Sequence, residues 1–519
     1  PEDRSGDFTF TRGSNLAATR VASNGLIEKG RENLLVQSNQ FDTTWLNAST
    51  TETSGQSGYD GSSDAWLLTK NGSGGYIYQN ISQSGVTTLS AYAKAKDSDY
   101  LLFICEGGSY QRFNLSNGTL GNGTAIDAKI ASVGNGWYRC SMVETASITR
   151  VRIFPAEENS TSAGSGSIYI QDAQLEVGLV ATDYIESGAT TGKAGLLENE
   201  PRIDFTGGGC GALLLEPQRS NLIGYSEYFE GWSNITNITP TSNYTDSPEG
   251  VDNATRLQFT ANGFTYYASA QVTGVQYTLS CYAKRNDSGT QNVGFFINGS
   301  GTVDSAWSLT NDWQRFTYTY TASNTSQRGI AGLSGADVSV YGFQVEQGSY
   351  PTSYIPTYGN IVTRSKDTTN VEDFSSFLTG EDVTYMFELK SNESLVRDDS
   401  SGNLIIQHDG GLANSFRVYR ASSNSITTTI VWFDGDIANN PAAYVINSAT
   451  PKVAIRRIYS TGAWDVFVDG VKTYSATNTN FLSFTRIHLQ GAGTPQKFKQ
   501  FVVFDTALTD EECSALTQP

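Results

Sequence analysis

Apolar and polar residues alternate one by one along several short stretches of this chain. The alternation is clear in TLSAYAK (88–94) and in QRFTYTYTA (314–322), where every second residue is apolar or aromatic. A period of two residues places successive side chains on opposite faces of a strand, so it predicts half-buried strands. Between residues 31 and 358 no segment keeps a helical period of 3.6 residues over three turns. Short stretches rich in Gly, Asn and Ser separate the strand patterns, as expected for turns.

The C-terminal part has a different pattern. VTYMFELK (383–390) alternates as a strand, and WDVFVDGVKTYS (464–475) predicts a hairpin because its Asp-Gly dipeptide tolerates the positive φ angles of a tight turn. The segment FVVFDTALTDEECSAL (501–516) predicts a strand followed by a helix. Thr509 and Glu512 have the spacing of a capping box, which is typical of a helix N-terminus.

A long internal duplication organises the first 356 residues. Five blocks recur in the same order, with an offset of 188 residues from Glu28 to Glu216 and 170 from Glu176 to Glu346, which implies shorter loops in the second copy. The matched blocks are GLIEKGRENLL (25–35) with LLLEPQRSNLI (213–223), NQFDTTWLN (39–47) with EYFEGWSN (227–234), TLSAYAKAK (88–96) with TLSCYAKRN (278–286), GNGWYRCSM (134–142) with TNDWQRFTY (310–318), and IYIQDAQLEVGLVATDYIE (168–186) with VYGFQVEQGSYPTSYIP (340–356).

Composition agrees with these patterns and limits the partners. The 519 residues exceed one hydrophobic core, and they combine 52 Gly with 27 Tyr and 25 Phe, a mixture that suits strands and turns. The net charge of −18 repels phosphate backbones and anionic lipid, so we expect neither nucleic-acid binding nor membrane insertion. No run approaches the roughly 20 apolar residues of a membrane-spanning helix. The opening PEDR is not a typical start, and we expect further sequence to precede it.

Three phrases of the chain resemble recurrent segments of bacteriophage tail-fibre and head-fibre proteins. They are DFTFTRGSNLAATRVASNGLIE (7–28), ALLLEPQRSNLIGYSEYF (212–229) and QVEQGSYPTSYIPTYGNIVTR (344–364). In those proteins such phrases frame jelly-roll modules similar to carbohydrate-binding modules. The C-terminal VVFDTALTDEECSAL (502–516) resembles the end of concanavalin-like and laminin-G-like sandwiches.

The patterns and the resemblance together imply an all-β chain of tandem antiparallel β-sandwiches, two jelly rolls and one concanavalin-like sandwich. We expect an N-terminal connector at 1–30, a first jelly-roll module at 31–186, a linker at 187–212, a second module at 213–358 that repeats the first, and a concanavalin- or laminin-G-like module at 359–519.

Tryptophan rings are the first candidates for sugar binding, because an exposed ring can stack on a pyranose face. Tryptophans that recur between the copies, such as Trp45 and Trp232, are expected in the core. Trp66, Trp307 and Trp432 have no partner in the other copy, and we take them as candidate ligand-binding residues. A core position is the alternative for each of the three.

One loop offers a candidate metal site. In WFDGDIANN (432–440), the oxygen-bearing side chains of Asp434, Asp436, Asn439 and Asn440 are of the type that calcium prefers. The alternative is an Asp-Gly turn between strands. Calcium is the one cofactor that the sequence suggests, and the sequence does not establish that any cofactor is bound.

A second calcium position comes from the resemblance alone. In many carbohydrate-binding jelly rolls, an Asp of the last strand helps to hold a structural calcium. The matching stretch reads Gln171-Asp172 in the first copy and Tyr341-Gly342 in the second, so the second copy lacks the expected ligand.

The chain lacks the common signatures of a hydrolase. It has two histidines, His408 and His488, no G-x-S-x-G turn, and no Glu-x-Asp-x-x-Glu strand. We therefore expect no enzymatic activity.

Two functions remain open at this stage. The first is a phage tail or head fibre, assembled in the host cytoplasm into a virion and attaching it to a bacterial surface polysaccharide without cleaving it. Several weakly binding modules in series suit such attachment by avidity, and a homo-oligomer, most readily a trimer, is expected. The alternative is a capsid decoration or connector protein that makes only structural contacts with other virion proteins.

Overall fold

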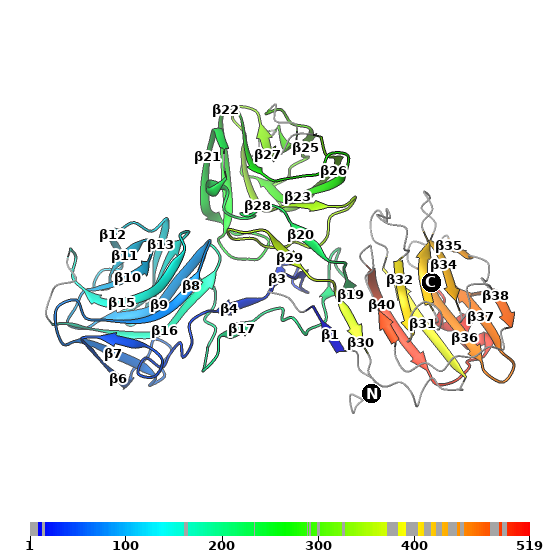
Figure 1. Cartoon of the computed structure of the whole chain (residues 1–519), viewed down its shortest axis with the longest axis horizontal. Coiled ribbons are helices and arrows are strands. Elements are labelled where there is room, and N and C mark those ends of the chain that lie inside the picture. Colours follow the sequence, from blue (N-terminus) through cyan, green and yellow to red (C-terminus); the bar gives the residue numbers. More distant parts are fainter. Residues whose placement is uncertain are drawn as a thin grey trace.

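The structure is a computed structural model in which strands dominate, and it confirms the predicted all-β class (Figure 1). It describes residues 9–159, 165–370, 382–390, 451–477 and 496–519, apart from 13–15, 233, 288, 290–291, 298–300 and 324–326, together with the backbone of five strands between 403 and 489. None of the helices in these residues has the length and apolar content needed to cross a bilayer.

The first sandwich consists of two six-stranded antiparallel sheets. Its core lies between them and contains Phe41, Trp45 and Phe103, each at most 4% exposed. The first sheet contains, in spatial order, β13 (Asp127–Gly134), β14 (Trp137–Glu144), β9 (Thr87–Ala95), β16 (Ser167–Val177), β7 (Ala65–Lys70) and β6 (Thr50–Gln56). The second contains β12 (Thr119–Gly123), β11 (Tyr110–Asn114), β10 (Tyr100–Glu106), β15 (Ile148–Ala156), β8 (Tyr76–Gln83) and β5 (Leu46–Ala48).

In the second sandwich one long strand belongs to both layers. The first half of β22 (Ala254–Ala268) pairs with β28, and its second half pairs with β27, so the strands form one continuous sheet folded around the core. The other strands are β21 (Asn234–Thr245), β23 (Gln276–Arg285), β24 (Val293–Phe296), β25 (Ser305–Ala306), β26 (Gln314–Thr321), β27 (Gln327–Gly332) and β28 (Asp337–Gln347), and a short 3-10 helix, η1 (Phe229–Gly231), precedes β21.

The two sandwiches share their strand layout. β9 pairs with β14 and β16 in the first sandwich, and β23 pairs with β26 and β28 in the second. Likewise β15 lies between β10 and β8, as β27 lies between β24 and β22. The duplicated sequence blocks fall on these equivalent strands, so positions can be compared one by one between the sandwiches.

The third sandwich has a seven-stranded and a five-stranded sheet. The predicted hairpin is confirmed at β37–β38, where Asp469 and Gly470 have φ angles of 48° and 85°. The predicted capping box at Thr509 and Glu512 is also confirmed, and it begins α2 (Asp510–Leu516). The sheets contain β18 (Ile203–Asp204), β19 (Ala212–Leu215), β40 (Gln496–Phe504), β31 (Val383–Leu389), β36 (Lys452–Ile458), β37 (Ala463–Val468) and β38 (Val471–Thr477), and β35 (Tyr444–Ile446), β34 (Thr428–Phe433), β33 (Arg417–Ala421), β32 (Asn403–His408) and β39 (Ile487–Leu489).

Short connector strands reach from one sandwich to another. The hairpin of β2 (Thr19–Val21) and β3 (Ile27–Lys29) precedes the first sandwich but contacts the second, where the amide of Ile27 donates to the carbonyl of Pro248 over 2.8 Å. The hairpin β18–β19 precedes the second sandwich but extends the third, because β19 pairs with β40. Residues 213–215, which the sequence assigned to the start of the second module, therefore complete an edge of the third sandwich. The remaining connector pairs are β1 (Thr9–Thr11) with β30 (Thr368–Asn370), β4 (Arg31–Asn33) with β17 (Gly192–Ala194), and β20 (Arg219–Asn221) with β29 (Val362–Arg364).

A buried ionic cluster ties these connectors together. Arg202 and Arg364 each donate to the same Glu216 carboxylate oxygen over 2.7 Å, while Arg12 and Arg202 both contact Asp367. All five side chains are at most 4% exposed. Burial alone would raise the pKa of Glu216, but Arg364 and Arg202 outweigh it and hold that pKa well below its usual value. The cluster joins the N-terminal segment, the linker and the segment after the second sandwich.

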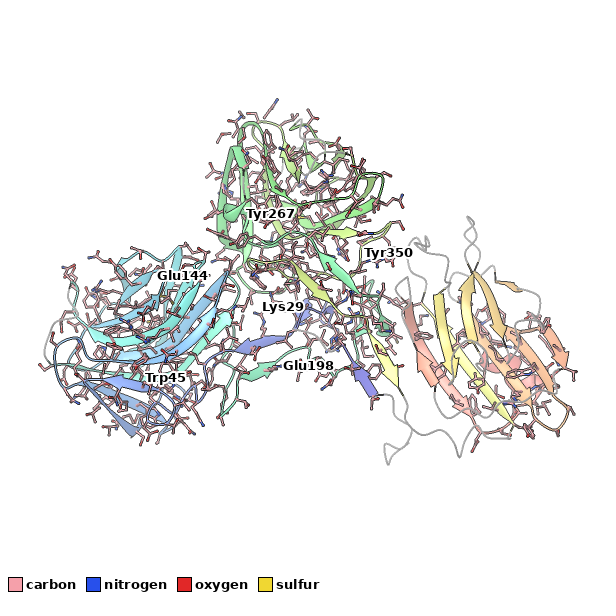
Figure 2. All side chains as sticks on the ribbon, in the orientation of Figure 1. Lys29, Trp45, Glu144, Glu198, Tyr267 and Tyr350 are labelled. Atoms are coloured by element: carbon pink, nitrogen blue, oxygen red, sulfur yellow. The ribbon has the colours of Figure 1, made fainter. Side chains whose placement is uncertain are left out.

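Lys29 forms a second buried ionic contact, between the connector and the second sandwich. Its ammonium lies 2.5 Å from Glu249 and 3.3 Å from Glu227, and it also donates to the Tyr358 hydroxyl. Figure 2 shows Lys29 at the centre of the molecule, between the first two sandwiches. Burial acts to raise the pKa of Glu249, but Lys29 and Arg31 hold it below its usual value.

Candidate functional site

Two of the tryptophans expected at a sugar-binding surface lie in hydrophobic cores. Trp66 is 7% exposed, packs edge-on against Phe41 at 6.0 Å, and donates its indole N–H to a backbone carbonyl. Trp307 is 5% exposed and lies between Phe295 and Phe316, with ring centroids 5.0 and 5.3 Å away. Neither ring has a free face for stacking on a sugar. Their burial overturns the surface role, because an unpaired tryptophan in a duplicated chain can equally fill a space that only one core contains.

The structure does not describe how the side chains of the remaining predicted site residues lie relative to one another. Trp432 belongs to β34, of which the backbone is described. Asp434, Asp436, Asn439 and Asn440 lie outside the described residues, so calcium at that loop stays a prediction. Within the described part of the chain, no group of three or more His, Cys, Asp and Glu side chains is arranged to hold a metal ion.

An aromatic cluster lies on the outer face of the first sandwich, on the sheet that contains β8, β10 and β15. Inward positions of these strands, such as Ile77, Phe103 and Ile153, are fully buried in the core. Because successive side chains of a strand point to opposite faces, the residues between them lie outside. These outer residues form an apolar cluster of their own, separate from the core: Leu102, Phe154 and Ala156, with the half-buried Tyr76, Tyr100, Ile104 and Tyr110 packed against them.

Tyr76 and Tyr78 are the central rings of this face. Tyr76 lies 4.7 Å from Phe154 and 5.7 Å from Tyr78, measured between ring centroids. Arginines approach both rings: the guanidinium of Arg152 lies 5.1 Å from the centroid of Tyr76, and that of Arg150 lies 4.6 Å from the centroid of Tyr78. Cation–π contacts of this kind hold a ring and a charge in a fixed arrangement.

Hydrogen-bonding groups border the rings. Asn80 accepts a hydrogen bond from Arg150 over 2.9 Å, and Asn114 donates to the hydroxyl of Tyr100 over 2.9 Å. Amides and hydroxyls beside a flat apolar ring are the groups that recognise a sugar, whose C–H face is apolar and whose rim carries hydroxyls. The six strands of this sheet contain a single carboxylate, Glu106, whereas glycoside hydrolysis ordinarily requires two. The face therefore combines the rings and the hydrogen-bonding groups that suit saccharide binding.

The second sandwich has aromatic rings at the same two positions. Phe264 and Tyr266 on β22 are half-buried and lie 5.6 and 6.3 Å from the ring of Phe296 on β24, two strands away in the same layer. Tyr266 lies opposite Gly329, as Tyr78 lies opposite Arg152. Glycine is required there, because a Cβ would come within 1.9 Å of the Thr265 carbonyl oxygen and 2.9 Å of the Phe296 ring.

The sequence does contain a signal for this repeated pair. GYIY (75–78) and GFTY (263–266) share the order glycine, aromatic, any residue, aromatic. The pair lies outside the five matched blocks, and its alternation resembles that of any core strand. Only the structure shows that the rings point away from both cores.

The two copies differ at the stretch matched to a calcium-binding strand. In the first sandwich Asp172 accepts a hydrogen bond from the Tyr59 hydroxyl over 3.0 Å. Burial raises the pKa of Asp172 to about 7; the Tyr59 hydrogen bond lowers it, while the nearby charges of Asp64 and Asp60 raise it further. In the second sandwich Gly342 occupies this position, and both residues have positive φ angles, 55° and 64°.

No family of known sequences and no curated protein matches this chain. Among solved structures, the chain is distantly similar to the CBM40 of the Ruminococcus gnavus IT-sialidase bound to α2,3 sialyllactose, with 16% identity over 28% of this chain and 91% of that one, at a TM-score of 0.22. It is similar to the CBM22-1–CBM22-2 tandem domain of Paenibacillus barcinonensis Xyn10C, with 10% identity over 61% and 98% of the two chains, at a TM-score of 0.22. It is also similar to the LG1-3 region of the laminin α2 chain, with 10% identity over 83% and 95%, at a TM-score of 0.14. These are carbohydrate-binding-module and laminin-G folds, and the similarity concerns the fold alone.

Proposed function

We propose that this chain is a non-catalytic saccharide-binding protein, and that it serves in a bacteriophage virion as a tail or head fibre that attaches to a bacterial surface glycan. The observation that carries the saccharide part is the aromatic pair on the outer face of both sandwiches, Tyr76 with Tyr78 and Phe264 with Tyr266. Packing in the core would explain rings that both copies keep inside the sandwiches. These rings, however, lie on the outer faces of both copies. The virion part rests on the resemblance of residues 7–28, 212–229 and 344–364 to fibre proteins.

Two weak sites on one molecule suit attachment. A single stack of a sugar on an aromatic ring contributes about 1 kcal/mol beyond area burial, so one face alone gives low affinity. The buried cluster around Glu216 and the contact of Lys29 with Glu249 connect the sandwiches through charged groups that are held away from water. Faces held on one body, and repeated further in an oligomer such as a trimer, bind a polymeric glycan together by avidity.

The test is binding of the full chain to cells of candidate host bacteria and to their isolated surface polysaccharide. The variants are Tyr76→Ala with Tyr78→Ala, Phe264→Ala with Tyr266→Ala, and all four together. We expect each double variant to weaken binding roughly tenfold and the fourfold variant to remove it, since the two faces act together. The control is Tyr244→Ala, which removes a 44% exposed ring elsewhere on the second sandwich and should bind normally.

A folded fourfold variant that binds as well as the wild type would contradict the proposal. A wild-type chain that binds no host surface, but is found between capsid subunits by antibody labelling of virions, would instead support the decoration or connector function.

A further inference from the structure

The outer face of the first sandwich is positively charged within an acidic protein. The chain as a whole has 52 acidic and 34 basic residues. In contrast, the six strands of this sheet contain four charged residues, of which three are arginines: Arg112, Arg150 and Arg152, with Glu106. These strands therefore have a local charge of +2, whereas the whole chain has a charge of −18. The local sign is opposite to the one that the composition predicts.

All four charged groups lie on the aromatic face. Arg152 lies opposite Tyr78 on β8 and opposite Ile104 on β10, and Arg112 lies opposite Leu102. Directly opposed residues of neighbouring strands share a face, so these side chains point to the same side as the aromatic rings.

The single carboxylate does not neutralise the three arginines. One oxygen of Glu106 contacts both Arg150, at 3.0 Å, and Arg152, at 2.6 Å. Arg112 lies 5.3 Å from the centroid of the Tyr110 ring, and within the described part of the chain no ion pair reaches it. The Arg150 and Arg152 side chains are 30% and 22% exposed, so part of each is accessible to a ligand, although the Nε of Arg152 is buried.

The second sandwich supplies an internal comparison. Its face keeps the aromatic pair, but Ala306, Gln327 and Gly329 occupy the positions of Arg112, Arg150 and Arg152, as judged from the register of the equivalent strands. The rings are thus common to both faces, and the arginines belong to the first alone. If the fold of the two sandwiches required the rings and the arginines alike, both kinds of residue would be present on both faces.

We propose that the outer face of the first sandwich binds saccharides that carry anionic groups, and that the face of the second binds the neutral part of a glycan. This inference rests on the function proposed above. A guanidinium offers paired N–H donors that match the two oxygens of a carboxylate or of a sulfate or phosphate ester, and an adjacent ring receives the apolar face of the same sugar. The residues that discriminate are Arg112, Arg150 and Arg152, and the rings Tyr76 and Tyr78 supply the binding common to all sugars.

The experiment measures binding of the full chain to matched acidic and neutral polysaccharides. The carboxylate pair is polygalacturonate and its carboxyl-reduced form, and the ester pair is dextran sulfate and dextran. The variants are Arg112→Gln, which removes the unpaired charge, and Arg112→Lys, which keeps it. Lys129→Gln is the control, because it removes a 71% exposed charge from the other sheet of the first sandwich.

We expect at least tenfold stronger binding to an acidic polymer than to its neutral counterpart, with a steep loss in salt. Arg112→Gln should reduce binding of the acidic polymer by about tenfold and leave binding of the neutral one unchanged. Arg112→Lys should restore part of the loss, and Lys129→Gln should change neither. The pair that shows the preference distinguishes carboxylate from sulfate. Equal binding of acidic and neutral forms, or an unchanged preference in Arg112→Gln, overturns this inference while the proposed function stands. No binding of any of the four polymers also overturns this inference, whereas the proposed function is decided by binding to the host surface polysaccharide.

Discussion

The first and second sandwiches differ least where their polar groups are buried and most on their outer faces. Asn33 and Asn221 are both fully buried and make the same four hydrogen bonds: each side-chain amide donates to two backbone carbonyls and accepts from two backbone amides. Glu176 and Glu346 likewise accept from the backbone and hydroxyl of Thr182 and Thr352, respectively. A buried polar group that lost these partners would be costly, so duplication preserves them.

The outer faces have diverged in charge while keeping their rings. Tyr76 and Tyr78 correspond to Phe264 and Tyr266, but the three arginines of the first face have no charged counterpart in the second. Packing of the core does not require half-buried aromatic rings on an outer face, so it does not explain why both sandwiches have them. The comparison therefore separates three sets of residues: buried polar groups that hold the fold, rings that we propose bind sugars, and charged groups that we propose select among sugars.

The largest effect expected from this comparison concerns Lys29. Its ammonium lies at the loop 247–253 of the second sandwich, whereas the described residues place no such cation at the equivalent loop 58–64 of the first. Lys29→Met leaves two buried carboxylates with less compensation, which should lower the free energy of unfolding of the second sandwich by about 3–5 kcal/mol.

Hydrogen exchange of peptides from each sandwich measures this loss separately. The control is Lys129→Met, because Lys129 and Asp252 form an ion pair whose side chains are 71% and 61% exposed and should contribute almost nothing. Equal loosening of both sandwiches in Lys29→Met would contradict the assignment of this contact to the second.

The buried asparagines provide a matched pair of the next size. Asn33→Ala and Asn221→Ala each leave two backbone amides and two carbonyls without their side-chain partner, so each should destabilise its own sandwich by about 3 kcal/mol. Denaturant unfolding followed by hydrogen exchange gives both values. A loss confined to one variant would show that the two anchors are not equivalent.

A smaller, pH-dependent effect distinguishes Asp172 from Gly342. The folded pKa of Asp172 is about 7, against an ordinary value of 3.8. Between these values the folded chain holds a proton that the unfolded chain has released, so stability falls as pH rises from about 4 to 7 and stays reduced above it. Asp172→Asn removes this penalty, and asparagine tolerates the positive φ of the position.

We expect Asp172→Asn to stabilise the first sandwich by about 2 kcal/mol at pH 8 and to have little effect at pH 4. Thermal unfolding of the variant and the wild type across this pH range measures the difference. Stabilisation that is the same at both pH values would show that the carboxylate does not titrate in this way.

The strands were largely predictable from the sequence, and the faces were not. Alternation located β9 and β26, and the capping box at Thr509 located α2, because both depend on neighbours close in the chain. Alternation cannot say which face of a strand points inward, so it did not single out Tyr76 and Tyr78 as outer residues, and Trp66 was expected at a surface although it lies in the core. The register that brings Arg112, Arg152 and Glu106 onto one face depends on strand pairings distant in sequence, as does the docking of each connector on a later sandwich.

Hydroxyl-radical footprinting of aromatic side chains in the full chain, free and saturated with a bound surface polysaccharide, tests the central claim most directly. The rate of ring oxidation reports whether a ring is covered. The account predicts that Tyr76, Tyr78, Phe264 and Tyr266 become protected several-fold, while Tyr244, which is 44% exposed on another surface, reacts as before. If the four rings oxidise at unchanged rates in a saturated protein, the saccharide binds elsewhere and the outer faces are not the binding sites.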